Sequence, residues 1–198
     1  MLIAACMKTA STSLMITLAK ILKLGYVQET HFIDKEKIGQ YPSCQFIPAK
    51  DMIRVSRARL KSWSENSNKV FKQHLVANRY HLKILKELDC KVVVLIRNYE
   101  DIVSSLKRAK IPISNEEKCL KQMKNFVDNY KKYFVGDNFL VIKFGEFVKN
   151  PTFYINEILN FWGFSELCSE KHRLEKHRLS NDRNNELNGV KMMPEREV

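Results

Sequence analysis

The chain has 198 residues, of which 44% are hydrophobic, and this length suits one domain with a sizeable buried core. Lysine and arginine number 34 against 22 acidic residues, and the net charge of +12 suits an anionic ligand or partner. The basic residues are spread along the chain, which favours a polyanionic small ligand over nucleic acid. No apolar run approaches the roughly 20 residues that a membrane span requires.

The cysteines and histidines give no sign of a disulfide framework or a metal site. The five cysteines are scattered and show no CxxC spacing, so we expect reduced thiols and a cytoplasmic location. The pairs His74/His81 and His172/His177 do not have the i,i+4 spacing of helical zinc ligands. We therefore expect no metal.

The chain opens with an expected strand followed by a helix. Residues 1–6 are an apolar run, typical of a buried strand. Apolar residues then recur at helical spacing over residues 14–22. Ser11 or Thr12 is the expected N-cap of this helix, and Gly25 is the expected left-handed C-cap.

The rest of the chain alternates expected helices and strands, after a loop over residues 41–48. The expected helices cover residues 49–65, 78–88, 99–109, 115–134 and 151–164. The expected strands cover residues 68–74, 91–97 and 138–144. This alternation predicts an α/β fold with three layers, in which helices cover both faces of a central parallel sheet.

Polar residues follow three of the predicted strands. The stretch KTASTS at 8–13 follows the first, Lys72 and His74 end another, and Arg97 ends the most β-branched one, KVVVLIR. Ligands of such sheets bind beyond the carboxyl ends of the strands. We therefore expect these residues to lie together.

Residues 8–13 have the composition of a phosphate-binding turn. Backbone N–H groups at a helix N-terminus bind phosphate oxygens, the hydroxyl side chains add donors, and Lys8 adds a positive charge. The stretch is not a Walker A loop, because it has no glycine and its lysine comes first. A helix cap beside a surface lysine is the alternative interpretation.

The order of these motifs resembles the PAPS-dependent sulfotransferase family, where PAPS is 3′-phosphoadenosine 5′-phosphosulfate. Residues 8–12 are similar to its Lys-Ser-Gly-Thr-Thr/Ser motif, with Ala10 in place of glycine. Residues 72–74 are similar to its Lys-x-His motif. Residues 97–105 are similar to its Arg-Asn-Pro-x-Asp-x-x-x-Ser motif, and Phe144 stands at the tyrosine of its Tyr-Glu-Asp segment.

The resemblance covers residues 1–164 and implies a P-loop-like sulfotransferase architecture in one domain, residues 1–198. Residues 165–198 form a polar C-terminal segment, in which the family's Arg-Lys-Gly clamp for the 3′-phosphate has no clear counterpart. The chain is also shorter than typical cytosolic members, so the loops that cover the acceptor are expected to be reduced.

The resemblance also implies a role for each motif. Lys8 stabilises the leaving phosphate, His74 is the general base for an acceptor hydroxyl or amine, and Lys72 is a supporting cation. The acceptor is a small molecule or a glycan, PAPS is the co-substrate, and PAP (3′-phosphoadenosine 5′-phosphate) is the product. The residues implied to bind the nucleotide are Lys8, Thr9, Ala10, Ser11, Thr12, Ser13, Arg97, Ser105 and Phe144.

Other interpretations of the same residues stay open. A kinase or other phosphotransferase on a similar fold predicts ATP binding that depends on magnesium. A non-catalytic basic protein predicts salt-dependent binding to nucleic acid. Within the motifs, His74 has a structural alternative, Arg97 has Asp101 as a possible ion-pair partner, and Ser105 has the alternative of an ordinary helix position.

Overall fold

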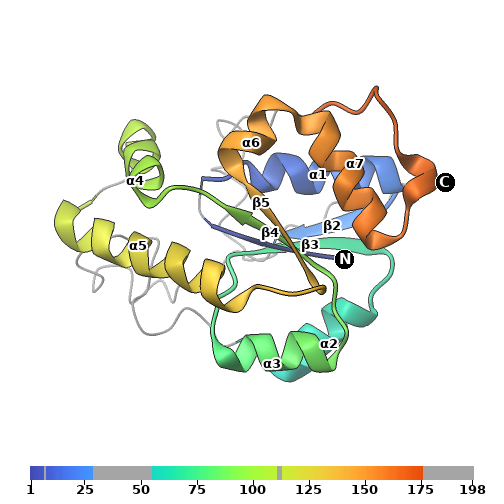
Figure 1. The fold of residues 1–198 in the computed structure, drawn as a ribbon, viewed down its shortest axis with the longest axis horizontal. Coiled ribbons are helices and arrows are strands. Elements are labelled where there is room, and N and C mark those ends of the chain that lie inside the picture. The colour runs from blue at the N-terminus through green and yellow to red at the C-terminus, as the bar shows by residue number, and fades with distance from the viewer. Residues whose placement is uncertain (7, 29–54, 111–112, 176–198) are drawn as a thin grey trace.

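A computed structural model describes residues 1–6, 8–28, 55–110 and 113–175. Its centre is a sheet of five parallel strands in the order β2-β3-β1-β4-β5 (Figure 1). The strands are β1 (Leu2–Ala5), β2 (Gly25–Gln28), β3 (Lys69–Gln73), β4 (Val92–Ile96) and β5 (Phe139–Lys143). The predicted loop at 41–48 and the start of the predicted helix at 49–65 lie outside the described residues.

Seven α-helices are seen in the described ranges, and none of them is long and apolar enough to cross a membrane. They are α1 (Ser11–Leu22), α2 (Arg57–Glu65), α3 (Arg79–Glu87), α4 (Tyr99–Arg108), α5 (Glu116–Tyr133), α6 (Phe144–Lys149) and α7 (Pro151–Trp162). A 3-10 turn, Ser165–Leu167, follows α7.

The sheet separates two hydrophobic clusters. Side chains alternate along β1, so Leu2 and Ala4 face one cluster while Ile3 and Ala5 face the other. Helices α2, α3, α4 and α5 supply the first cluster, and α1, α6 and α7 supply the second. Figure 1 shows α2, α3 and α5 on one side of the sheet and α1, α6 and α7 on the other. The three-layer α/β fold with a parallel sheet is confirmed.

Both predicted caps of the first helix are wrong. Ala10, with φ of 55°, is the N-cap of α1, and Ser11 is already helical. At the other end Lys23 is the left-handed residue, with φ of 55°. Its N–H donates to the Lys20 carbonyl, and the next N–H donates to the Ala19 carbonyl, a Schellman arrangement.

Two short elements are missing from the sequence prediction. Gly25, the expected cap, instead begins the edge strand β2, which pairs with β3 from Gly25↔Lys69 onward. Phe144, expected at the end of a strand, begins α6. Four and six residues are too few to show a clear hydrophobic period.

Candidate active site

The three polar segments predicted to form a site follow three neighbouring strands. β1 lies between β3 and β4, with the pairs Ala4↔Gln73 and Ala5↔Leu95 near its carboxyl end. Because all the strands are parallel, the segments that follow them leave the sheet at the same edge. Hydrogen bonds join the last residue of β1, Ala5, to His74 after β3, and join Lys8 in the turn after β1 to Arg97 after β4.

The turn between β1 and α1 has an uncommon backbone. Lys8 and Ala10 both have positive φ, 59° and 55°, a region that costs an L-residue roughly 1–2 kcal/mol. Between them the buried Thr9 hydroxyl donates to the Cys6 carbonyl at 2.7 Å, which ties the turn back to the end of β1. The hydroxyl of Thr9 therefore shapes the turn.

The N-terminus of α1 has no side-chain cap of its own within segment 8–28. Ala10 has no polar side chain, and the first turn of α1 contains no acidic residue. The Ala10 carbonyl accepts the first helical bond, from the Leu14 N–H at 3.0 Å. The positive end of the helix dipole lies at Ser11 to Ser13, where it attracts an anion.

His74 is held by a backbone carbonyl. Its Nδ1 lies 2.7 Å from the Ala5 carbonyl oxygen, which can only accept, so Nδ1 carries the hydrogen. The Nε2 of the neutral ring is then the acceptor. Lys72 Nζ lies 3.3 Å from this Nε2, and the Lys72 side chain is otherwise buried at the end of β3. The predicted pair Lys72 and His74 is thus one hydrogen-bonded unit.

Tyr130, on α5, contacts the same carbonyl, although it belongs to none of the predicted motifs. Its hydroxyl donates to the Ala5 carbonyl oxygen at 3.3 Å. Burial raises the pKa of this hydroxyl well above its ordinary value, so it stays a donor. Tyr130 and Phe126 are four residues apart and both buried on α5, a spacing that is typical of core residues and gives no sign of this polar contact.

Arg97 connects β4 to the β1–α1 turn. Its Nη1 donates to the Lys8 carbonyl oxygen at 2.7 Å, and its guanidinium carbon lies 4.2 Å from the centroid of the Phe144 ring. Its Nε is shielded from solvent and has no acceptor among the described residues. Such an unsatisfied charged donor fits an anionic ligand group.

The charges around Lys8 favour an anion as well. Burial lowers the pKa of the Lys8 ammonium, and the positive charges of Arg97 and Arg108 lower it further. Burial also lowers the pKa of Arg97, while Asp101 opposes that shift. A bound phosphate would relieve the repulsion among these cations.

Ser105 is the predicted site residue that is not directly joined to the others. It lies half-buried on α4, two turns after Arg97, and within the described chain no hydrogen bond links the two side chains. Lys8, Arg97 and Phe144 form one contact group, and Lys72 with His74 forms a second beside it.

A domain model described as a sulfotransferase domain matches residues 1–197 of the chain. The chain belongs to the sulfotransferase family. A comparison of the chain with curated protein sequences finds no match.

Solved sulfotransferase structures share the fold. Mouse sulfotransferase SULT7A1 complexed with PAP is 14% identical, with a TM-score of 0.53 over 85% of this chain and 62% of that one. A sulfotransferase from Alicyclobacillus acidocaldarius is 15% identical, with a TM-score of 0.57 over 89% of this chain and 85% of that one. The present chain thus spans about three fifths of the mouse protein.

Kinases share the fold as well. A sugar kinase from Janibacter is 14% identical, with a TM-score of 0.56 over 85% of this sulfotransferase and 96% of the kinase. Identities this low show the fold alone, so the P-loop-like architecture is common to both classes. In the part of the chain that the structure describes, no three His, Cys, Asp or Glu side chains are grouped to hold a metal ion.

Proposed function

We propose that this sulfotransferase moves the sulfuryl group of PAPS to a hydroxyl or amine of a small-molecule or glycan acceptor. One observation carries the proposal: His74 is hydrogen-bonded to Ala5 at the end of β1, and Arg97 is hydrogen-bonded to Lys8 in the turn that follows. A cation for the leaving phosphate, an anion-binding arginine and a candidate base therefore share one edge of the sheet.

The nucleotide-binding role rests on the β1–α1 turn and on Arg97. The backbone N–H groups of residues 9–13 and the hydroxyls of Ser11, Thr12 and Ser13 hold the 5′-phosphate at the positive end of α1. Arg97, stacked on Phe144, binds the 3′-phosphate together with Ser105. The unsatisfied Arg97 Nε supports this assignment, because a phosphate oxygen would satisfy it.

The chemical role rests on Lys8, Lys72 and His74. In the transfer, the bond between sulfur and the 5′-phosphate oxygen breaks while a bond forms between sulfur and the acceptor oxygen or nitrogen. Lys8 neutralises the charge that develops on the leaving phosphate oxygen. His74 takes the acceptor proton on Nε2, the nitrogen that its bond to Ala5 leaves as an acceptor. Lys72, 3.3 Å from that nitrogen, is the supporting cation.

A nucleotide-dependent kinase is the second candidate, favoured by the near-complete coverage of kinase chains by this fold. Its usual loop places a lysine after several glycines, so that backbone amides wrap the phosphates. Here Lys8 comes before the hydroxyl residues, and the left-handed positions are Lys8 and Ala10 instead of glycines. These features favour the sulfotransferase proposal.

The proposal is tested by removing Arg97 and comparing two nucleotides that differ in the 3′-phosphate. A hydrogen bond to a charged group contributes about 1.5–3 kcal/mol, so Arg97→Ala should weaken PAP binding by roughly one to two orders of magnitude. The affinity for 5′-AMP should fall only a few-fold. This nucleotide has no 3′-phosphate, so Arg97 would affect its binding only by holding the Lys8 carbonyl in the turn. Both dissociation constants are measured by calorimetry.

Arg97→Lys is the matched control, since it keeps the charge and loses the planar fork of donors. It should bind PAP with an affinity between those of the wild type and Arg97→Ala. Equal losses for PAP and 5′-AMP in Arg97→Ala would contradict the assignment and leave Arg97 as a support for the turn.

A further inference from the structure

Arg108, one turn beyond Ser105 on α4, adds a third positive charge to those of Lys8 and Arg97. Arg108, in the last turn of α4, is close enough to Lys8 and Arg97 for its charge to lower the pKa of each. Asp101 attracts Arg97, but one carboxylate cannot neutralise three cations. The cluster therefore suits a ligand group that carries more than one negative charge.

The spacing along α4 explains how Arg108 joins this cluster. Asp101, Ser105 and Arg108 are four and three residues apart, so they form one stripe along the helix. Asp101 and Ser105 belong to the motif that starts at Arg97. The buried apolar side chains of α4 occupy another side of the helix, against the core. Arg108 thus extends the polar stripe of the candidate site by one turn.

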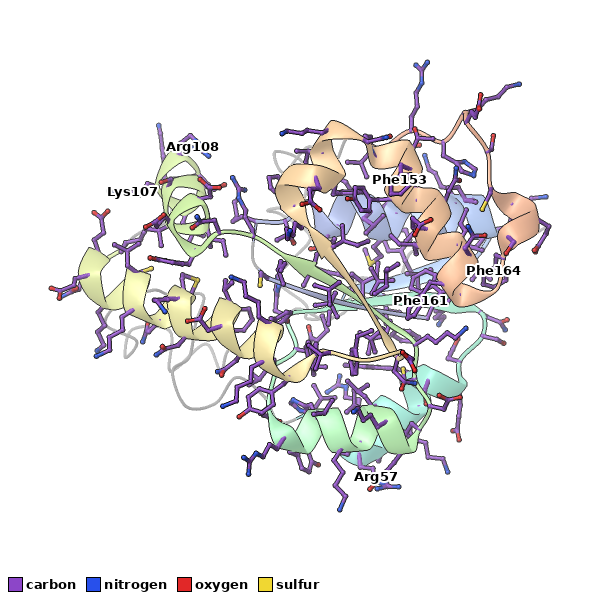
Figure 2. All side chains as sticks on the ribbon, viewed as in Figure 1. Arg57, Lys107, Arg108, Phe153, Phe161 and Phe164 are labelled. Carbon is purple, nitrogen blue, oxygen red and sulfur yellow. The ribbon has the colours of Figure 1, made fainter. Side chains whose placement is uncertain are left out.

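Lys107, the residue beside Arg108, has the same charge but lies on another side of the helix α4. Successive helical residues are about 100° apart around the axis. The Lys107 ammonium pairs with Glu116 at the start of α5, at 2.7 Å. Figure 2 shows both residues at the end of α4 farthest from the sheet. They share a helix turn, a charge and an exposed position, but only Arg108 continues the stripe of Ser105.

We propose that Arg108 is a further binding residue for the 3′-phosphate of the nucleotide, acting with Arg97 and Ser105; this inference rests on the proposed function. Arg97 already uses Nη1 on the Lys8 carbonyl, so only part of its donor fork is available to a ligand. A phosphate dianion accepts more hydrogen bonds than the remaining donors of Arg97 and the Ser105 hydroxyl supply. The guanidinium of Arg108 supplies the missing donors and charge.

The experiment uses the full chain and its matched pair of variants, Arg108→Ala and Lys107→Ala. Dissociation constants for PAP and 5′-AMP are measured by calorimetry at one fixed salt concentration. Arg108→Ala should weaken PAP binding about tenfold, as expected for one charge-assisted contact, and change 5′-AMP binding less than about twofold. Lys107→Ala should change either affinity less than about twofold, because it removes the same charge from the other flank of the helix.

Three results would overturn the inference while leaving the proposed function in place. PAP affinity unchanged in Arg108→Ala is the first. The second is an equal loss of PAP affinity in Lys107→Ala, which would show that any positive charge in this helix turn has the same effect. An equal loss of 5′-AMP affinity is the third. A wild-type chain that does not bind PAP would instead remove the proposed function, and this inference with it. If Arg108→Ala has a lower Tm than the wild type, the test is repeated with Arg108→Gln, which keeps a long polar side chain without the charge.

Discussion

His74 and Tyr130 share one acceptor, the Ala5 carbonyl oxygen, and this shared contact determines which imidazole nitrogen is available for chemistry. Removing the imidazole by His74→Ala takes away the proposed base and leaves the turn at Lys8 and its bond to Arg97 intact. Turnover should therefore fall by about 10²–10⁴, the usual contribution of a general base. PAP affinity should stay nearly the same.

Turnover and PAP affinity are measured on the same preparations. Turnover is followed as the release of PAP from PAPS in the presence of a panel of phenols, alcohols and amines. PAP affinity serves as the control for misfolding. Turnover at the wild-type level in His74→Ala would show that another group accepts the proton, or that none is needed.

Lys8 leads to a prediction about pH. Burial and the charges of Arg97 and Arg108 lower the pKa of its ammonium in the free protein, so it loses its proton at a lower pH than an ordinary lysine. Bound phosphates favour the protonated form. PAP affinity should therefore fall as the pH rises through the lowered pKa of the free protein.

Lys8→Arg separates this titration from other alkaline effects, because a guanidinium keeps its charge throughout the range. Titrations between about pH 7 and pH 10 should show a fall in PAP affinity for the wild type and a flatter profile for Lys8→Arg. Parallel profiles for the two proteins would assign the pH dependence to another group.

The β1–α1 turn is the element on which the site depends, and it contains backbone strain. Ala10 has a positive φ at a position where the family motif has glycine. Ala10→Gly removes the clash of the methyl group, although glycine also gains freedom in the unfolded chain. The free energy of unfolding should rise by about 0.5–1 kcal/mol, with PAP affinity little changed.

Ala58→Gly is the matched control, because Ala58 is exposed in the helix α2. There the same substitution should lower the free energy of unfolding by about 0.5–1 kcal/mol. The free energies of unfolding are measured by urea denaturation. Changes of opposite sign in the two variants would support a strained turn at Ala10. Equal destabilisation by both would show that Ala10 is not strained in the folded protein.

Over the whole molecule, much of the fold and the positions of the site motifs could be predicted from sequence. The β-branched run before Arg97 and the apolar run before Lys8 are long enough to show buried strands. Cations and hydroxyls directly after such strands must gather at one edge of a parallel sheet. This reasoning brought Lys8, Lys72, His74 and Arg97 together as a predicted site. In the structure Lys72 contacts His74, His74 contacts the end of β1, and Arg97 contacts the Lys8 carbonyl.

What could not be predicted depends on contacts between distant residues. The left-handed conformations at Ala10 and Lys23 are found at residue types that normally avoid them, so local propensity indicates other caps. Tyr130 at helical spacing is indistinguishable from a core residue until its hydroxyl meets the Ala5 carbonyl. Arg108 is one of 34 basic residues, and only the path of α4 brings it near Lys8.

Stabilisation by ligands is the most direct test of the proposed function, because it shows which nucleotide the folded protein binds. PAP at about 100 times its dissociation constant should stabilise the protein by roughly 2.7 kcal/mol. For a chain of this length that corresponds to a rise in Tm of roughly 5–10 °C. 5′-AMP and Mg-ATP at the same concentration should each give a much smaller rise, since neither has a 3′-phosphate. A larger rise with Mg-ATP than with PAP would contradict the sulfotransferase mechanism and favour a kinase.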